Sequence, residues 1–264
     1  MALGYGVVKP LGGLLALVTA TTALAAGGTS EPWRPAVSSA IHYASHRRGV
    51  IAFAVRTPTR SWGWRAAETF PSASVLKAML LVAYLDLPSV RGRPLRPADR
   101  ALLGPMIRRS DNAAAGKVLG IVGSARLRRL ARRAGMRRFT PVTGVWGLSR
   151  IDAADQTRYL LRIDTLTPIR HRAYALRLLR TITPSQRWGI ARVKPAGWRL
   201  YFKGGWGLGT GWVDHQVALL TRGDERVSVA ILTHLDGSHA YGEETLRGLA
   251  LRLLGGLDSA EAVP

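Results

Sequence analysis

The segment from Phe70 to Leu85 constrains the fold of this chain more than any other stretch. A turn that ends near Ser74 is followed by an apolar helix over 78–85. If Ser74 opens that helix, Lys77 lies one turn later on the same helical face. A serine hydroxyl is a poor nucleophile until a base takes its proton, and a partly desolvated, neutral lysine can be that base. Unpaired N–H groups at the helix N-terminus would also favour developing negative charge there.

The Ser74–Lys77 pair has an ordinary structural explanation as well. A serine in front of a helix is usually its N-cap, and a lysine usually lies on a solvated face. Two further motifs change this interpretation. Ser110-Asp111-Asn112 lies between two helical patterns, and Lys203-Gly204-Gly205 ends a strand-like run.

These three motifs occur together in the penicillin-recognising serine enzymes, which include class A β-lactamases and penicillin-binding proteins. The chain resembles this superfamily, and its class A members most closely, over roughly residues 35 to 255. Phe70-Pro71 precedes the serine motif and Pro195 to Trp198 leads into the late lysine motif, much as in class A enzymes. The resemblance implies a two-lobe α+β fold of the β-lactamase/transpeptidase type. Its five-stranded antiparallel sheet would be flanked by the terminal helices and would carry an inserted all-helical lobe.

The domain boundaries follow from this resemblance and from the N-terminal composition. Residues 1–26 have the outline of a secretory signal peptide, with Lys9, an apolar run from Leu11 and a small-x-small end at 23–25. We therefore expect the protein to be secreted or to lie in the cell envelope, and to be attached to the membrane only if this segment stays uncleaved. We also expect a monomer. The catalytic domain is predicted at 31–257, with a sheet lobe at about 31–70 and 195–257, a helical lobe at about 71–194, and a tail at 258–264.

The charge balance is strongly basic. Lysine and arginine number 38 against 16 acidic residues, a formal charge of +22. Such an excess is typical of nucleic-acid-binding proteins. Here the arginines are spread over many segments without a nucleic-acid motif, so we expect solvated faces and no nucleic-acid partner. The helix predicted over 124–134 has an outward face of Arg126, Arg129, Arg132 and Arg133, and this face is the best candidate for an anionic partner.

The resemblance implies a role for each motif residue. Ser74 would attack the substrate amide with Lys77 as its base, and Ser110 would relay a proton to the leaving nitrogen. The backbone N–H groups of Ser74 and Trp206 would form the oxyanion hole, which commonly contributes about 2.7–4 kcal/mol per donor. Lys203 would place a cation beside the Ser110 hydroxyl and the substrate carboxylate.

The remaining motif residues would bind substrate or support the site. Asn112, Gly204 and Gly205 join Lys203 in the predicted substrate-binding set, and Asp111, expected to be buried, would brace its loop. No metal or organic cofactor is implied. His42 and His46 are four positions apart but lack a third ligand, so we interpret them as surface histidines.

Two positions depart from the class A pattern. In class A enzymes a glutamate about 34 positions beyond the motif asparagine activates the water that hydrolyses the acyl-enzyme. Here that interval falls near Trp146, and no glutamate occurs between Glu68 and Glu225. Asp152 and Asp155 follow, but 149–152 resembles the capping sequence of a helix start.

The second departure is Gly204, which stands where the family has a hydroxyl residue. Losing a hydrogen bond to a charged group typically costs about 1.5–3 kcal/mol, so we expect weaker or different recognition of the substrate acid.

The sequence therefore predicts an exported β-lactamase-like serine hydrolase that acts on a β-lactam or related amide through an acyl-enzyme on Ser74. Because the deacylating glutamate is absent, two alternatives stay open. One is a D,D-peptidase or esterase of the penicillin-binding type, and the other is a weakly catalytic binder of cell-wall peptide. The intact nucleophile and base favour catalysis, because a binder needs neither.

Overall fold

The computed structural model describes residues 1–4 and 33–258. Apart from residues 1–4, the predicted signal segment at 1–26 lies outside the described residues. The predicted tail at 258–264 lies outside them too, apart from Asp258. None of the helices within the described ranges is long and apolar enough to cross a membrane.

A five-stranded antiparallel sheet forms one lobe, in the order β2-β1-β7-β6-β5. Its strands are β1 (Val50–Arg56), β2 (Ser61–Trp64), β5 (Arg199–Gly207), β6 (Val213–Arg222) and β7 (Glu225–His234). Eight consecutive residues of β6 and seven of β7 are buried, so both faces of the central strands are covered. In the edge strand β2 the residues alternate between exposed and half-buried, as expected of a strand with one solvated face.

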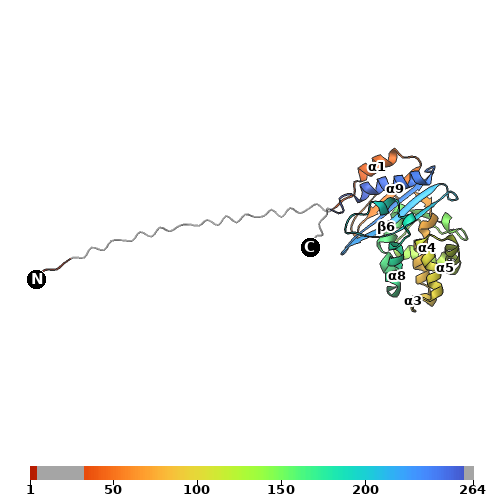
Figure 1. The fold of residues 1–264 in the computed structure, drawn as a ribbon, viewed down its shortest axis with the longest axis horizontal. Coiled ribbons are helices and arrows are strands. Elements are labelled where there is room, and N and C mark those ends of the chain that lie inside the picture. The colour runs from red at the N-terminus through yellow and green to blue at the C-terminus, as the bar shows by residue number, and fades with distance from the viewer. Residues whose placement is uncertain (5–32, 259–264) are drawn as a thin grey trace. The chain divides into compact units, whose positions relative to one another are not determined.

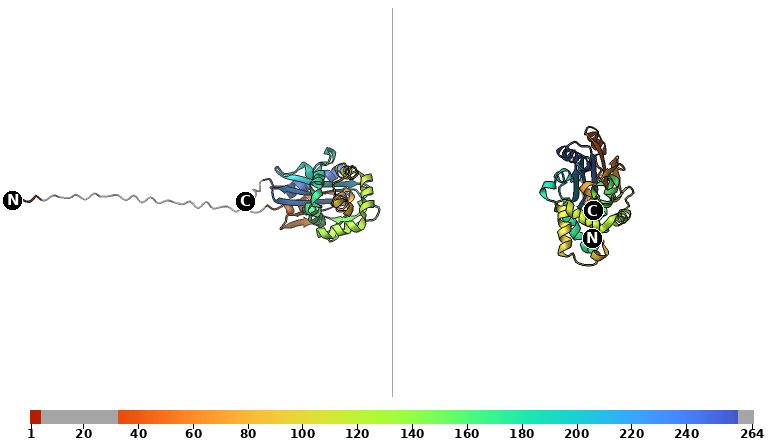
Figure 2. Two further views of the ribbon diagram at one scale, coloured as in Figure 1. Left: turned by 90° about the horizontal axis from the view of Figure 1, so that it is seen from below. Right: turned by 90° about the vertical axis from the view of Figure 1, so that its right-hand side faces the viewer.

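Two terminal helices, α1 (Val37–Ser45) and α9 (His239–Leu254), pack against each other on one side of the sheet (Figures 1 and 2). Their close approach depends on Gly248, because a Cβ at this position would overlap the ring and hydroxyl of Tyr43. The buried stripe of α9 includes Leu246, Leu249 and Leu253, the face predicted from the sequence.

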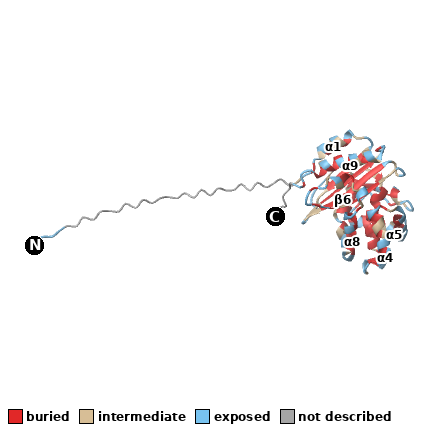
Figure 3. Cartoon of the chain, in the orientation of Figure 1, coloured by how far each residue is buried: buried red, intermediate tan, exposed pale blue. Residues whose placement is uncertain are grey.

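The second lobe is mainly helical and is inserted between β3 (Thr69–Pro71) and β5. It consists of α2 (Leu76–Leu85), α3 (Pro88–Arg91), α4 (Pro97–Arg108), α5 (Asn112–Ala134), α6 (Ala153–Leu161), α7 (Ile163–Leu166) and α8 (Ile169–Arg180). Short 3₁₀ turns connect them, namely η1 (Ala73–Val75), η2 (Trp146–Leu148), η3 (Pro184–Gln186) and η4 (Gly189–Arg192). All ten residues of α2 are buried, as expected of a helix that is apolar all round, and α4 and α5 pack against it. Figure 3 shows buried residues concentrated in the sheet and on the inner sides of these helices.

The helix predicted over 124–134 is the second half of a longer helix, α5. Gly123 interrupts α5 with φ 72° and ψ 158°, values outside the helical region, so the chain changes direction there. Gly135 ends the helix in the left-handed conformation, φ 75°, as glycine commonly does.

The inserted lobe also contains one short strand. β4 (Arg150–Asp152) pairs with β3, with Phe70 opposite Ile151, and so ties the chain in front of Ser74 to the start of α6. The sequence predicted a helix start at 149–152 but no strand. The cap itself is present, because the Asp152 carboxylate accepts the N–H of Asp155 at 2.8 Å. The predicted two-lobe α+β fold is confirmed.

Candidate active site

Ser74 lies in the 3₁₀ turn η1, between the short strand β3 and the buried helix α2. The residue before it, Ala73, has φ +41°, a conformation that costs a non-glycine residue free energy and is found most often where function requires it. The Ser74 side chain caps neither η1 nor α2. The ordinary N-cap explanation of this serine is therefore excluded, and its hydroxyl is left for other chemistry.

Lys77 is fully buried in the first turn of α2. Its amine donates hydrogen bonds to Asn112 Oδ1 at 2.7 Å, to Ser110 Oγ at 3.1 Å and to the Ser110 carbonyl oxygen. All three acceptors are neutral. Burial lowers the pKa of Lys77 to about 7, and the charge of Asp111 opposes that shift only in part. A large share of these amines is therefore unprotonated near neutral pH and can accept a proton.

Trp146 lies next to this amine, at the position where the class A pattern has a glutamate. Its ring centroid is 4.5 Å from Lys77 Nζ. The turn that carries it, η2, is held by Ser72, whose hydroxyl donates to the Trp146 carbonyl oxygen at 3.0 Å. An indole face attracts a cation but cannot take a proton from water. The site thus presents an aromatic ring to Lys77, not a carboxylate.

The two aspartates that follow in the sequence are engaged elsewhere. Asp155 Oδ2 accepts the backbone N–H groups of Arg137 and Arg138 at 2.7 Å each, and its Oδ1 accepts from Arg158 at 2.8 Å. Asp152 caps α6, and burial raises the pKa of its carboxyl to about 7. Within residues 33–258, no hydrogen bond connects either carboxylate to Ser74 or Lys77.

The Ser-Asp-Asn motif forms the connection between α4 and α5. Ser110 adopts φ +58°, a second strained non-glycine backbone at this site. Asp111 accepts the N–H of Ala114 at 2.7 Å and so caps α5. The expectation that Asp111 is buried is wrong, because the start of α5 is at the surface and leaves its carboxylate half-buried. The side chain nonetheless holds the motif loop against the helix.

Lys203 comes from β5 in the sheet lobe, and its amine reaches the Ser110 hydroxyl that Lys77 also contacts. Its amine donates to Ser110 Oγ at 3.1 Å and to the Gly204 carbonyl oxygen at 2.7 Å. Complete burial, and secondarily the nearby Lys77, hold the pKa of Lys203 well below its usual range. The two lysines and the serine hydroxyl form a continuous chain along which a proton can move.

The strand β5 runs directly beside the backbone of Ser74. A Cβ on Gly205 would lie 2.9 Å from the backbone nitrogens of Ser74 and Val75, so only glycine fits. The next residue, Trp206, follows on the same strand, as the predicted oxyanion pair with Ser74 requires. At Gly204 a Cβ would lie 3.2 Å from the Trp188 ring. The indole of Trp188 therefore lies beside the position at which class A enzymes have a serine or threonine side chain.

An aromatic group beside Lys203 was not found by sequence reasoning. The Trp206 ring stacks on His239 at 5.6 Å between centroids and meets Trp188 edge-on at 5.8 Å. His239 is paired with Asp214, and this hydrogen bond raises the pKa of the imidazole. Trp188 precedes η4 and His239 begins α9, so no local motif connects them. The high number of tryptophans, eight, was the only signal in the sequence.

No three His, Cys, Asp or Glu side chains of the described residues gather in a way that could hold a metal ion. Of the predicted site residues, the structure brings Lys77, Ser110, Asn112 and Lys203 into one hydrogen-bonded network and places Gly205 against Ser74.

Comparison with known proteins agrees with this arrangement. The model of a family described as the β-lactamase enzyme family matches residues 94–256. No curated protein matches the chain. Among solved structures, a β-lactamase from Sphaerobacter thermophilus has a TM-score of 0.73 at 18% identity and covers 86% of this chain and 98% of its own.

Two further structures have a similar likeness. A class A β-lactamase from Mycobacterium abscessus has a TM-score of 0.69 at 19% identity, over 85% of this chain and all (100%) of its own. A mutant of PBP-A, solved as an acyl-enzyme complex with penicillin G, has a TM-score of 0.68 at 15% identity, over 84% of this chain and 96% of its own. At these identities the likeness establishes the fold, whereas the family match covers more than half of the sequence. The chain therefore belongs to the β-lactamase enzyme family and is a β-lactamase-like serine hydrolase.

Proposed function

We propose that Ser74 forms an acyl-enzyme with a β-lactam or a related amide of cell-wall peptide. The observation that carries this proposal is the buried amine of Lys77, whose hydrogen-bond acceptors are all neutral and whose pKa is about 7. The unprotonated amine takes the Ser74 hydroxyl proton as Oγ attacks the amide carbonyl carbon. In the free protein Lys77 bonds to Ser110 and Asn112, and catalytic hydrogen bonds commonly tighten only when substrate is bound.

The rest of acylation uses the network around Ser110. The N–H groups of Ser74 and Trp206 stabilise the oxyanion, a role supported by the close approach of β5 to the Ser74 backbone. As the C–N bond breaks, protonated Lys77 gives its proton to the Ser110 hydroxyl, and Ser110 gives its own to the leaving nitrogen. Lys203, bonded to the same hydroxyl, offers N–H donors to the substrate carboxylate.

Release of the acyl group is the slow step in this proposal. Trp146 lies beside Lys77 where a carboxylate would activate water. The two aspartates that follow it in the sequence, Asp152 and Asp155, bond to backbone N–H groups and an arginine. These observations favour a D,D-peptidase or esterase of the penicillin-binding type as the second candidate. A binder without chemistry is disfavoured, since burying two lysine amines is costly and gains nothing for simple binding.

We also propose that residues 1–26 direct export, which would place the site where cell-wall amides occur. The support is the signal-like composition of that segment. To test export, the full chain is expressed and the N-terminus of the purified protein is sequenced. A mature N-terminus shortly after residue 25 is expected, and a cytoplasmic protein that keeps Met1 would contradict export.

The acylation proposal is tested by mixing the protein with benzylpenicillin and measuring the intact mass. We expect one penicillin to be added to the wild-type chain and none to the Ser74→Ala variant, with peptide mapping placing the adduct on Ser74. Circular dichroism checks that the variant is folded. An adduct on another residue, or equal labelling of the variant, would overturn the assignment.

A further inference from the structure

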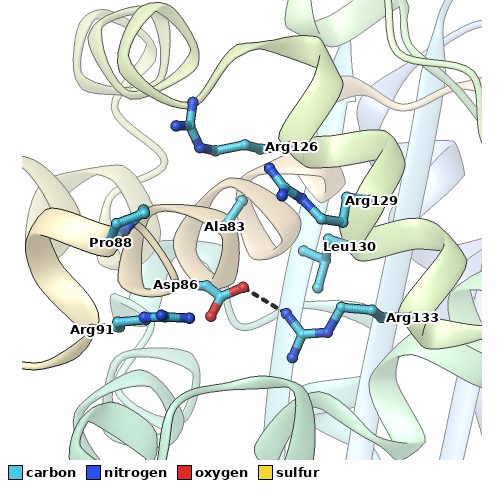
Figure 4. A pocket seen from close by; sticks show the side chains of 8 residues that line it. All are labelled: Ala83, Asp86, Pro88, Arg91, Arg126, Arg129, Leu130 and Arg133. Carbon is cyan, nitrogen blue, oxygen red and sulfur yellow. Dashed lines mark hydrogen bonds and ion pairs between the residues drawn. The ribbon is translucent and has the colours of Figure 1, made fainter.

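A hollow opens at the far end of α2, away from Ser74 (Figure 4). Ser74 precedes the first turn of this ten-residue helix and Asp86 follows its last turn, so about 15 Å of helix separates the two sites. The hollow has a volume of about 390 Å³, within the range of small-ligand sites. Its lining comes from α2, α3 and the second half of α5, namely Ala83, Asp86, Pro88, Arg91, Arg126, Arg129, Leu130 and Arg133.

Four guanidinium groups turn toward this hollow. Arg126, Arg129 and Arg133 stand at positions i, i+3 and i+7 of α5 and therefore share one helical face. Arg91 reaches in from α3 on the opposite side, as Figure 4 shows. The break at Gly123 begins the second half of α5 in a new direction, and this half carries the three arginines.

The charge of the hollow is not balanced by the protein. Asp86 is the one acidic residue in the lining, and it pairs with Arg133 at 2.5 Å. Within residues 33–258, Arg91, Arg126 and Arg129 have no carboxylate partner, and in this sense they are unpaired. Arg126 uses one N–H on the Val122 carbonyl oxygen at 3.2 Å, which leaves its other donors for a ligand. The segment 124–134 contains five arginines and no acidic residue. Like charges held around a concave surface repel one another, and a bound anion relieves that repulsion.

The remaining lining suggests what kind of anion fits. Ala83 and Leu130 are buried and form an apolar floor with Pro88, which can contact the carbon part of a ligand. Guanidinium groups bind phosphate through paired N–H donors of matching geometry. Arg126 and Arg129 on α5 and Arg91 on α3 line this one small hollow from two sides, which favours a compact ligand over a long polyanion.

We propose that this hollow binds a compact phosphate-bearing anion, a diphosphate or a phosphoester with a small organic group. The three unpaired arginines bind the phosphate oxygens, and Arg133 stays paired with Asp86. The site is independent of the chemistry at Ser74, so either proposal can fail without the other.

The same helix supplies a matched control. Arg128 and Arg132 are exposed residues of α5 that do not line the hollow. We would titrate the full chain with inorganic pyrophosphate by isothermal calorimetry. Saturable one-site binding is expected for the wild type, weakened at least about tenfold in R126Q/R129Q and at most about twofold in R128Q/R132Q. Equal weakening in both double variants would show a diffuse charge effect and overturn the site, as would the absence of saturable binding to the wild type.

Two further binding experiments identify the chemical class and the source of the ligand. Citrate carries a similar charge without phosphate, and binding as tight as that of pyrophosphate would contradict the assignment to phosphate. Vesicles of phosphatidylcholine with and without phosphatidylglycerol test a lipid source. Binding to the anionic vesicles that pyrophosphate displaces would assign a lipid headgroup, and pyrophosphate binding without vesicle binding would assign a soluble phosphate compound. Both double variants are expected to form the penicillin adduct at the wild-type rate, which separates this test from the test of Ser74.

Discussion

At the scale of single residues, the chemistry of this protein depends on the protonation of Lys77. Its amine is buried and bonded only to neutral acceptors, and its pKa is lowered to about 7 because charge is poorly solvated there. The amine accepts a proton only when it is neutral, so acylation should become faster as pH rises through this pKa. We expect the acylation rate with a penicillin to rise between pH 5.5 and 8.5 with a midpoint near 7, measured by stopped-flow or quenched mass spectrometry.

Three variants identify the titrating group. Lys77→Arg keeps the positive charge but cannot accept the proton, so the rate should fall about 10²-fold or more. Lys117→Arg, at an exposed position, is the matched control and should leave the rate unchanged. The hydrogen bond with Asp214 raises the pKa of the His239 imidazole, and the midpoint should survive in His239→Asn. A midpoint that disappears with His239 would contradict the role given to Lys77.

Trp146 is the second residue with a testable consequence. Its ring lies 4.5 Å from Lys77 Nζ, so a glutamate at this position would bring a carboxylate close to the acyl-enzyme. We expect Trp146→Glu to shorten the lifetime of the penicillin adduct at least about tenfold, since a positioned general base typically contributes 10²–10⁴-fold. The new negative charge should also move the midpoint of the acylation pH profile upward, because it favours protonated Lys77.

Trp146→Leu separates the carboxylate from the loss of the indole. The adduct lifetime in this variant should stay within about threefold of the wild type, because leucine offers no base. An equally short lifetime in the leucine variant would mean that Trp146 only shields the acyl bond from water.

The residues that the structure brings together could be picked out from the sequence where they belong to a recognisable motif. Lys77, Ser110 and Lys203 come from three distant segments and meet through hydrogen bonds to one hydroxyl. Reasoning failed for Trp188 and His239, which join Trp206 only through tertiary packing. Burial of Asp111 was misjudged for the same reason, since the exposure of one helix end depends on what packs around it.

At the scale of elements, the site depends on how closely β5 passes η1. Gly205 has no room for a side chain, because a Cβ would lie 2.9 Å from two backbone nitrogens. Backbone atoms cannot relieve such an overlap by a change of rotamer, as the end of a side chain can. We expect Gly205→Ala to push the strand from Ser74, to slow acylation at least about tenfold by spoiling the oxyanion hole, and to lower the melting temperature.

Gly209 in the loop after β5 gives the matched control, because a Cβ there would contact nothing within 4 Å. Gly209→Ala should therefore leave both acylation and the melting temperature close to the wild-type values. Unchanged acylation in Gly205→Ala would contradict the assignment of this strand to the oxyanion hole.

Helices were easier to predict than short strands. The periodic stretch at 243–254 lies within α9, and the apolar run at 78–85 lies within α2, since both carry their own hydrophobic pattern. β4 has only three residues and exists because β3, about 80 positions earlier, pairs with it. Such a strand has no signal of its own in the sequence. A helix cap within 149–152 was predictable because a cap acts on adjacent backbone, and in the structure that cap is Asp152.

At the scale of the whole molecule, buried amines make stability depend on pH. The pKa values of Lys77 and Lys203 are lowered in the folded state, so above pH 7 the unfolded chain binds more protons than the folded one. Stability then rises with pH until the unfolded lysines also lose their protons near pH 10, by up to about 1.4 kcal/mol per pH unit and group. The buried carboxyls of Asp152 and Asp236, with pKa values raised to about 7, act in the opposite direction only below that pH.

We therefore expect the melting temperature to rise between pH 7.5 and pH 9, measured by differential scanning calorimetry. The window ends at pH 9 because burial raises the pKa of Tyr84 and Tyr159, which opposes the rise once unfolded tyrosines lose their protons near pH 10. Lys77→Met removes one buried amine and should reduce the slope while raising stability at pH 8. A melting temperature that falls over this range, or an unchanged slope in Lys77→Met, would contradict the burial of uncharged lysines.

The overall architecture was predictable because three motifs fix three distant points of one known fold. The resemblance that these motifs carry implied the sheet lobe and the inserted helical lobe, which the structure shows. The basic hollow was only partly predictable. The outward arginines of 124–134 were recognised, but their convergence with Arg91 depends on the packing of α3 against the end of α2.

We propose that Ser74 is acylated quickly and released slowly, since Lys77 can accept a proton and Trp146, not a carboxylate, lies beside its amine. The most direct measurement mixes the protein with one equivalent of benzylpenicillin, removes free drug, and follows the intact mass over time. We expect full conversion to a single adduct that persists for many minutes and never forms in Ser74→Ala. Rapid drug consumption without an accumulating adduct would show efficient deacylation and would contradict the role given to Trp146.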